Sequence, residues 1–126
     1  MTTNNKWDVL FIKDDKSNFD SGTKVFDEVF HRVDMTQGRE ESLRRFKNNL
    51  YDMVICDLSA DPEEIAFMKQ LKDLKPKQAI FVFVEEKDTP KVYGFADLGM
   101  NAFILSPDQF DEALAEIARF DPYAEQ

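Results

Sequence analysis

The sequence has little cysteine, a shortage of basic residues and no long apolar stretch. Cys56 is its only cysteine, so neither an intrachain disulfide nor a thiolate zinc cluster can form. There are 16 lysines and arginines against 25 aspartates and glutamates, which gives a net charge of −9. Nucleic acids and anionic membrane surfaces are bound through basic residues, so this balance argues against both partners.

Apolar stretches such as residues 79–84 are far too short to cross a bilayer. No apolar segment follows the first six residues, which therefore do not resemble a signal peptide. The 43% of apolar residues, with 12 phenylalanines among them, is enough for a buried core. We expect one cytoplasmic domain over residues 1–126, with its core at about 7–120 and a C-terminal tail at 121–126.

Short apolar runs suggest the strands of a sheet. Four of them, rich in Val, Ile and Phe, are continuous rather than alternating, which indicates strands covered on both faces, as in a parallel sheet. They lie at residues 9–12, 53–56, 80–84 and 103–105, with a weaker fifth candidate at 32–35.

Segments with helical spacing separate these runs, at residues 19–30, 40–49, 62–74, 90–98 and 110–120. In the second, Leu43, Phe46 and Leu50 share one face, and in the last the inward stripe is Phe110, Leu114, Ile117 and Ala118. Strands and helices alternate five times. This pattern predicts an α/β fold with a doubly wound, five-stranded parallel sheet in the flavodoxin-like order 2-1-3-4-5.

Acidic residues follow two of the predicted strands. Asp14 and Asp15 follow the first strand, and Asp57 ends the third. These strands are neighbours in the predicted order, and open α/β sheets place their sites at the carboxyl ends of strands. The three carboxylates should therefore converge, and they repel one another unless a cation neutralises them. Oxygen ligands of this kind suit Mg²⁺, although acidic pairs at strand ends also serve as helix caps and turns.

Two segments resemble a known family. Residues 9–15, VLFIKDD, look like the start of a response-regulator receiver domain of the CheY type, and Asp57 lies where that family carries its phosphoacceptor. Residues 98–107, LGMNAFILSP, resemble the family's fifth-strand signature. The resemblance covers roughly residues 7 to 120. It implies that Asp14, Asp15, Asp57 and the backbone carbonyl of Ser59 bind Mg²⁺, and that Asp57 accepts a phosphoryl group from a histidine kinase or a phosphotransfer protein.

The match fails at two positions that contact the phosphoryl group in the family. Val84 stands where the family has a Thr or Ser, and Ser106 stands where it has a Lys before the final proline. Lys13 and Lys87 are candidate replacements, although Lys87, with Glu85 and Glu86, is more simply read as part of a solvated loop. Phe103 occupies the family's aromatic switch position, and core packing is its simpler interpretation.

Two functions therefore remain open. The first is a phosphoaccepting receiver domain of a two-component system, with a possible homodimer through its fourth helix, fifth strand and fifth helix. The second is a pseudo-receiver that binds proteins independently of phosphorylation. An independent enzyme is not expected, because Asp57 is not followed by a second acid at the +2 position that haloacid-dehalogenase-type phosphatases use. We expect His31 to be a surface or capping residue and Cys56 an inert core thiol.

Overall fold

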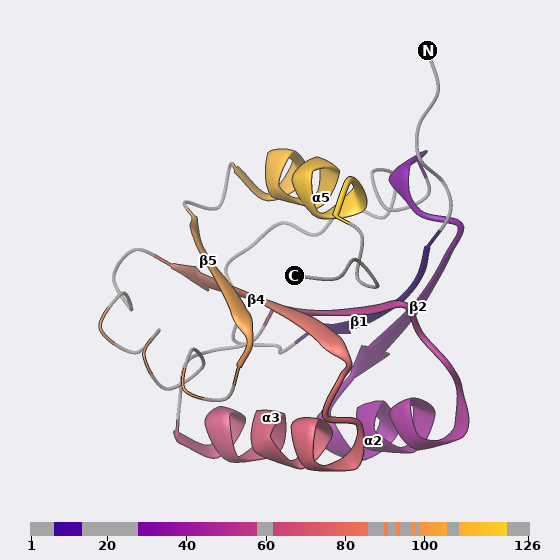
Figure 1. Ribbon diagram of the computed structural model, residues 1–126, viewed down its shortest axis with the longest axis vertical. Helices are drawn as coiled ribbons and strands as arrows, with labels where there is room; N and C mark the ends of the chain where they lie inside the picture. Colours follow the sequence, from indigo (N-terminus) through magenta and orange to yellow (C-terminus); the bar gives the residue numbers. More distant parts are fainter. Residues whose placement is uncertain are drawn as a thin grey trace.

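The structure of the protein is a computed structural model, in which residues 7–13, 28–57, 62–85, 90, 93, 97, 99–105 and 109–120 are described. Its strands are β1 (Asp8–Lys13), β2 (Arg32–Gln37), β3 (Met53–Asp57), β4 (Ala79–Glu85) and β5 (Asn101–Leu105). Its labelled helices are α2 (Arg39–Asn48), α3 (Pro62–Leu74) and α5 (Phe110–Ala118). Figure 1 shows α5 on one side of the sheet and α2 and α3 on the other.

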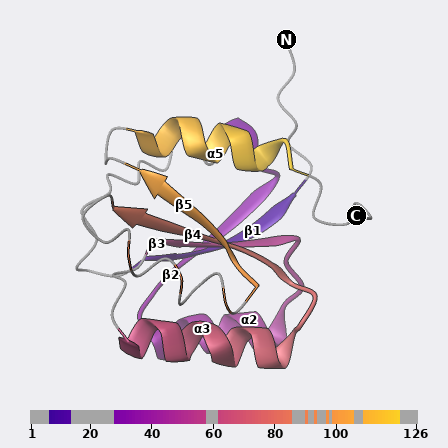
Figure 2. The ribbon, with the colours of Figure 1, turned by 60° about the vertical axis from the view of Figure 1, so that its left-hand side comes forward.

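All five strands are parallel and pair in the order β2-β1-β3-β4-β5. The predicted α/β fold, parallel sheet and strand order are therefore confirmed. Because the strands run in one direction, all their carboxyl ends lie at one edge of the sheet, where the arrowheads of β4 and β5 point in Figure 2. The amino ends form the opposite edge.

Alternate residues of the central strands enter two separate cores, because successive side chains of a strand point to opposite faces. In β1, Leu10 and Ile12 face α2 and α3, whereas Val9 and Phe11 face α5. In β4, Val82 packs in the first core and its neighbour Phe83 in the second. Both faces are buried, which explains why the strands appear in the sequence as continuous apolar runs.

The structure confirms the stripe of inward-facing residues predicted for helix α5. The side chains of Phe110, Leu114, Ile117 and Ala118 are buried, together with Ala113. The ring of Phe110 meets Phe11 and Phe83 edge-on, with centroid distances of 6.1 and 5.1 Å. Two acidic residues in the first turn complement the positive end of the helix dipole. The helix is thus anchored to the sheet along its whole length, with aromatic contacts at its first residue.

Helix α2 differs from the prediction at its end. Leu50 does not share the buried face of Leu43 and Phe46 but is 86% exposed. The helix ends at Asn48, and Asn49 has an extended backbone with φ of −134°. The helical period therefore stops before Leu50, and the chain turns its side chain towards solvent.

The other boundaries agree with the predicted segments to within a few residues. Helix α3 has the predicted bounds, while β2 extends two residues beyond its predicted end. Most of the helices predicted at 19–30 and 90–98 lies outside the described residues; positions 28 and 29 are helical. Gly38, with φ of +87°, makes the sharp turn from β2 into α2, and the hydroxyl of Ser42 donates to its carbonyl at 2.6 Å.

Candidate functional site at the carboxyl end of the sheet

The backbone brings the ends of β1 and β3 together at the edge where the acidic site is predicted. The two strands are paired, and Lys13 lies opposite Asp57 in the register. Asp57 is the last residue of β3, and the chain continues from Lys13 directly into Asp14. The register therefore puts the predicted phosphoacceptor position next to the point where the predicted acid pair begins.

Most of the predicted site residues lie outside the described part of the chain. These are Asp14, Asp15, Ser59 and Ser106, together with the candidates Glu86 and Lys87. The side chains of Lys13, Asp57 and Glu85 also lie outside it, although the backbones of Lys13 and Asp57 belong to β1 and β3. The loop predicted at Glu85 is wrong, because Glu85 is the last residue of β4 and its backbone pairs with Leu105 of β5. The geometry of the acidic cluster and its Mg²⁺ therefore stays a prediction.

Val84 is the last residue of β4 whose side chain the structure describes. It is 2% exposed and belongs to the core beneath α2 and α3, with Ile80 and Val82. Its backbone pairs with Ile104 of β5. The side chain has no hydroxyl and packs against apolar groups, so it offers no hydrogen bond to a phosphoryl oxygen.

Phe103 lies on β5 and is half-buried. Its ring meets the rings of Phe81 and Phe83 edge-on, at centroid distances of 6.0 and 6.1 Å. It packs against the core beneath α5. Edge-to-face pairs of this kind stabilise a core beyond the area that they bury. These contacts agree with the core-packing interpretation of this position.

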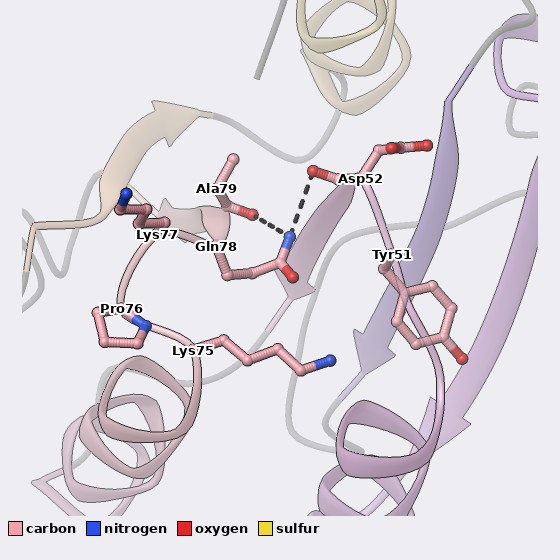
Figure 3. Close-up of a pocket in the computed structure, with 7 residues that line it drawn as sticks. All are labelled: Tyr51, Asp52, Lys75, Pro76, Lys77, Gln78 and Ala79. Carbon is pink, nitrogen blue, oxygen red and sulfur yellow. Dashed lines mark hydrogen bonds between the residues drawn. The ribbon is translucent and has the colours of Figure 1, made fainter. Parts of the chain in front are cut away.

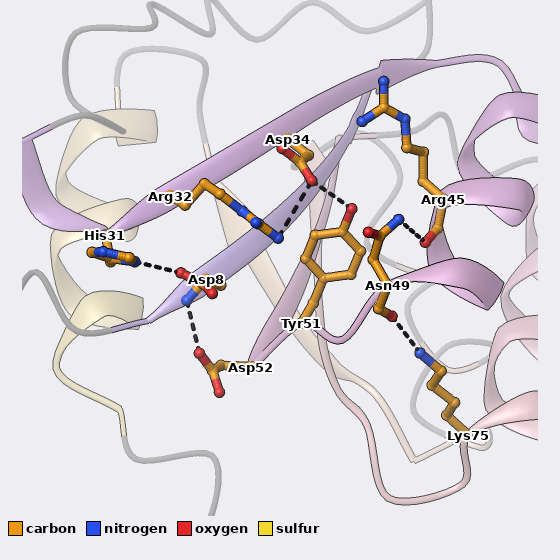
Figure 4. A network of polar contacts seen from close by, with 9 residues as sticks. All are labelled: Asp8, His31, Arg32, Asp34, Arg45, Asn49, Tyr51, Asp52 and Lys75. Carbon is orange, nitrogen blue, oxygen red and sulfur yellow. Dashed lines mark hydrogen bonds and ion pairs between the residues drawn. The ribbon is translucent and has the colours of Figure 1, made fainter.

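A second group of polar residues, which the sequence analysis did not single out as a set, lies at the amino end of the sheet (Figure 4). Nδ1 of His31 donates to Asp8 at 2.7 Å, and the backbone N–H of Asp8 donates to the carboxylate of Asp52 at 2.8 Å. The hydroxyl of Tyr51 donates to Asp34 at 2.6 Å. His31 is exposed, as expected for a surface residue. These residues are far apart in sequence, so no local pattern reveals the network.

Tyr51 has a perturbed ionisation within this network. Burial is the largest cause, followed by the hydrogen bond to Asp34 and the negative charge of that residue, and together they raise the pKa of Tyr51 to about 12. The positive charges of Arg32 and Arg45 act in the opposite direction. The guanidinium of Arg32 lies 6.0 Å from the centre of the Tyr51 ring. The tyrosine is therefore held neutral up to strongly alkaline pH.

Within the described ranges, no group of three or more acidic, histidine or cysteine side chains is arranged to hold a metal ion. In the same part of the chain, no helix is long and apolar enough to cross a membrane. Cys56 is buried in β3, as predicted for a core thiol.

Comparison with protein-family models and with curated protein sequences gives no match. Solved structures do match. One is a CheY-like response regulator receiver domain protein from Methanospirillum hungatei, with 16% identity, a TM-score of 0.64 and 94% of both chains covered. Another, a receiver domain protein from Clostridium thermocellum, shares 18% identity over 88% of this chain and 92% of that one, with a TM-score of 0.63.

A third match is NtrX from Brucella abortus, with 16% identity and a TM-score of 0.68. The alignment covers 94% of this chain but 27% of that protein. The fold is thus that of CheY-like response regulator receiver domains, as the sequence resemblance implies. At these identities the likeness establishes the fold, and the chemistry of the site has to be argued from this chain's own residues.

Proposed function

We propose that this chain is a receiver domain of a two-component system, in which Asp57 accepts a phosphoryl group from a histidine kinase or phosphotransfer protein in the presence of Mg²⁺. The observation that carries the proposal is the register of β1 and β3, with Lys13 opposite Asp57. It supports a convergence of Asp14, Asp15 and Asp57 at the carboxyl edge of a sheet with the receiver fold. We propose a cytoplasmic signalling domain rather than an enzyme.

The chemistry proposed for this edge follows from its carboxylates. An oxygen of Asp57 attacks phosphorus, a P–O bond forms, and the bond between phosphorus and the donor's nitrogen breaks, so that the donor imidazole leaves. Asp14, Asp15, Asp57 and the carbonyl of Ser59 are the oxygen ligands proposed for Mg²⁺. The ion, when bound, neutralises charge on the phosphoryl oxygens.

A pseudo-receiver is the second candidate function, and the burial of Val84 favours it. A hydroxyl at this position would give the phosphoryl group a contact in one conformation of the fourth strand. Val84 instead packs in the core. A phosphoryl group with equal affinity for two conformations shifts no equilibrium between them. If Asp57 is phosphorylated without such a contact, the signal has to pass by another route.

Titration with Mg²⁺ and then beryllofluoride, followed by amide NMR, tests both functions. A phosphoaccepting receiver gives Mg²⁺-dependent shifts at the ends of β1 and β3, and further shifts on adding the phosphoryl mimic. Shifts with Mg²⁺ alone would favour the pseudo-receiver. A folded protein with no shifts at either strand end would contradict the proposed site.

A double variant, Val84→Thr with Ser106→Lys, measures how much affinity for the phosphoryl mimic is lost at the two positions that depart from the family. It should bind beryllofluoride more tightly than wild type, by about 1–3 kcal/mol for restored contacts to charged oxygens. Equal affinity would mean that wild type supplies these contacts from other residues, with Lys13 and Lys87 the first to substitute.

We also propose the face of the fourth helix, β5 and α5 as the surface that binds partners or a second copy. Tyr93, in the segment before β5, is 72% exposed, and Ile104 of β5 is 43% exposed. These exposed apolar side chains are the ones that the proposed contact would bury.

Tyr93→Glu should weaken self-association in sedimentation or binding of a partner kinase. Met35→Glu, which places the same charge on an exposed side chain of β2 at the opposite edge of the sheet, is the control. If the folded Tyr93→Glu protein behaves as wild type in both measurements, the interface lies elsewhere.

A further inference from the structure

The amino end of the sheet carries an open hollow with a volume of about 440 Å³. It is lined by Tyr51, Asp52 and residues 75–79, so it lies where the chain enters β3 and β4 (Figure 3). The carboxyl ends of the same strands, where the phosphoryl site is proposed, form the opposite edge. We call this feature the amino-end hollow, and its role does not depend on phosphorylation of Asp57.

Hydrogen bonds hold the walls of the hollow in place. Nζ of Lys75 donates to the carbonyls of Phe46 and Asn49 at 2.7 and 2.9 Å and lies 4.5 Å from the centre of the Phe46 ring. Nε2 of Gln78 donates to the carbonyl of Asp52 at 3.2 Å. These bonds join the end of α3 to the end of α2 and to the start of β3. A partner would therefore meet a preformed surface and lose little free energy in ordering it.

Basic residues collect around the hollow of an otherwise acidic protein. Residues 44–52 and 69–79 contain seven of the 16 basic residues and only two of the 25 acidic ones. Basic residues are common near the C-termini of helices, where they interact with the helix dipole and the last carbonyls. Lys72 and Lys75 are explained in this way, because both donate hydrogen bonds to backbone carbonyls. Arg45, Lys47 and Lys77 have exposed side chains, which leaves their charge available to a partner.

The charges are placed on two sides of the hollow. Lys77 is a lining residue that lies across from Tyr51 (Figure 3), and Arg45, on α2, lies on the far side of Tyr51 from Asp52 (Figure 4). The one carboxylate of the lining belongs to Asp52, and it accepts a hydrogen bond from the backbone N–H of Asp8 at 2.8 Å. Asp8 and Asp34 bring two further carboxylates next to Asp52 and Tyr51. The exposed basic residues Arg44, Arg45, Lys47 and Lys77 outnumber these three acids, so the balance of charge here is slightly positive, although the whole protein carries −9.

Apolar groups occur next to the same lining residues. Leu50, which directly precedes Tyr51, is 86% exposed, and Leu74, which directly precedes Lys75, is 46% exposed. Single exposed leucines are common on protein surfaces. The lining itself includes Tyr51, Pro76 and Ala79, which provide an apolar anchor point of the kind found at the centre of protein interfaces, and the two leucines adjoin lining residues in the chain.

We propose that the amino-end hollow is a docking site for an acidic peptide segment of another protein. An apolar side chain of the segment enters the hollow against Tyr51, Pro76 and Ala79, next to Leu50 and Leu74 in the chain, and carboxylates on either side of it pair with Lys77 and Arg45. The surrounding positive charge selects an acidic occupant, and the apolar anchor distinguishes it from a ligand bound by charge alone.

Selection from a random dodecapeptide library displayed on phage, with the full chain as bait, tests the proposal. The enriched peptides should combine several acidic residues with a Leu, Ile, Met or Phe. Synthetic versions of them, added to ¹⁵N-labelled protein, should shift the amides of residues 50–52 and 75–79. The variant Leu50→Ser/Lys77→Glu should weaken their binding by about tenfold or more.

The matched control is Met35→Ser/Arg119→Glu, which makes the same kinds of change on β2 and after α5, and it should bind as wild type. Amide spectra of both variants show that each is folded. Enriched peptides that are neutral or basic, or shifts that map to another surface, would overturn the proposal. Equal binding of an acidic peptide without its apolar residue, or of single-stranded DNA, would also overturn it in favour of a general anion surface. Loss of self-association in Leu50→Ser would overturn it in favour of a second copy of this chain.

Discussion

Tyr51 shows how a single residue of this protein is set by contacts remote in sequence. Its ring contributes to the core beneath α2 and α3, and its hydroxyl donates to Asp34 on β2. Removing the hydroxyl leaves the carboxylate without this donor, while the apolar contacts of the ring remain. The residue therefore connects the edge strand β2 to the core, and its raised pKa reflects both its burial and its hydrogen bond to Asp34.

We predict that Tyr51→Phe lowers the free energy of unfolding by about 1–2 kcal/mol at neutral pH, because it removes a hydrogen bond to a charged acceptor. In wild type, the folded pKa of about 12 exceeds the unfolded value of 10.0. The folded state therefore binds more protons between these values, and the stability that Tyr51 contributes falls as pH rises from about 10 to 12.

Urea unfolding of wild type and variant across this pH range measures the difference, which should shrink as pH rises. Tyr93→Phe is the control, since Tyr93 is exposed, and it should leave the free energy of unfolding at neutral pH unchanged. A constant difference between wild type and Tyr51→Phe at all pH values would show that Tyr51 titrates normally.

At the scale of elements, Lys75 ties the end of α3 to the end of α2. The ammonium donates to two carbonyls that the helix itself leaves without partners. Burial lowers the pKa of Lys75, because it disfavours the charged ammonium, and the two hydrogen bonds compensate for this loss of solvation. Two helices that are separate in sequence are thereby fixed side by side under the sheet.

We predict that Lys75→Met lowers the free energy of unfolding by about 1–2 kcal/mol, because two carbonyls lose a charged donor while the apolar stem is kept. Lys69→Met is the matched control. It breaks an exposed ion pair with Asp73 on the same helix and should cost about 0.5 kcal/mol or less. Chemical denaturation measures both variants. Equal losses would mean that the Lys75 bonds contribute no more than a surface pair.

Helix α5 is attached through aromatic contacts at its first residue. We predict that Phe110→Ala lowers the free energy of unfolding by about 3–4 kcal/mol, because it empties a fully buried site beside Phe11 and Phe83. Hydrogen exchange should rise in α5 more than in α3, which lies across the sheet. In Phe120→Ala the lost ring is partly exposed, so a much smaller effect is expected. Uniform loss of protection would show that α5 does not open separately.

For the whole molecule, the proposed acidic cluster couples stability to metal binding. We predict that Asp57→Asn raises the free energy of unfolding without metal by on the order of 1 kcal/mol, because it removes one of three mutually repelling charges. Mg²⁺ should stabilise wild type, by about 1.4 kcal/mol at ten times its dissociation constant, and the variant less.

Thermal unfolding with EDTA and with Mg²⁺ measures this coupling. Asp97→Asn, which changes an exposed aspartate in the segment before β5, controls for the overall negative charge of the chain. If Asp57→Asn melts below wild type in EDTA, the carboxylates do not repel one another and the convergence is wrong. If Asp97→Asn gives the same gain, the effect belongs to net charge rather than to the cluster.

The fold class could be predicted from local patterns in the sequence. Continuous apolar runs of four or five residues indicate strands buried on both faces, and segments of helical spacing between them require parallel strands with crossover helices. The bounds of α3 and the buried stripe of α5 could be read directly, because both depend on local periodicity. The positions of Asp57 and Val84 at strand ends follow from the same pattern.

The exposure of Leu50 and the meeting of polar residues at the amino end of the sheet could not be predicted in this way. The helical period predicted a buried Leu50, but the extended backbone of Asn49 ends α2 and exposes it. Tyr51, Lys75 and Gln78 form a hollow because pairing of β3 with β4 brings their segments together. Periodicity describes one element at a time, whereas contacts between the loops that enter neighbouring strands exist only once the sheet has assembled.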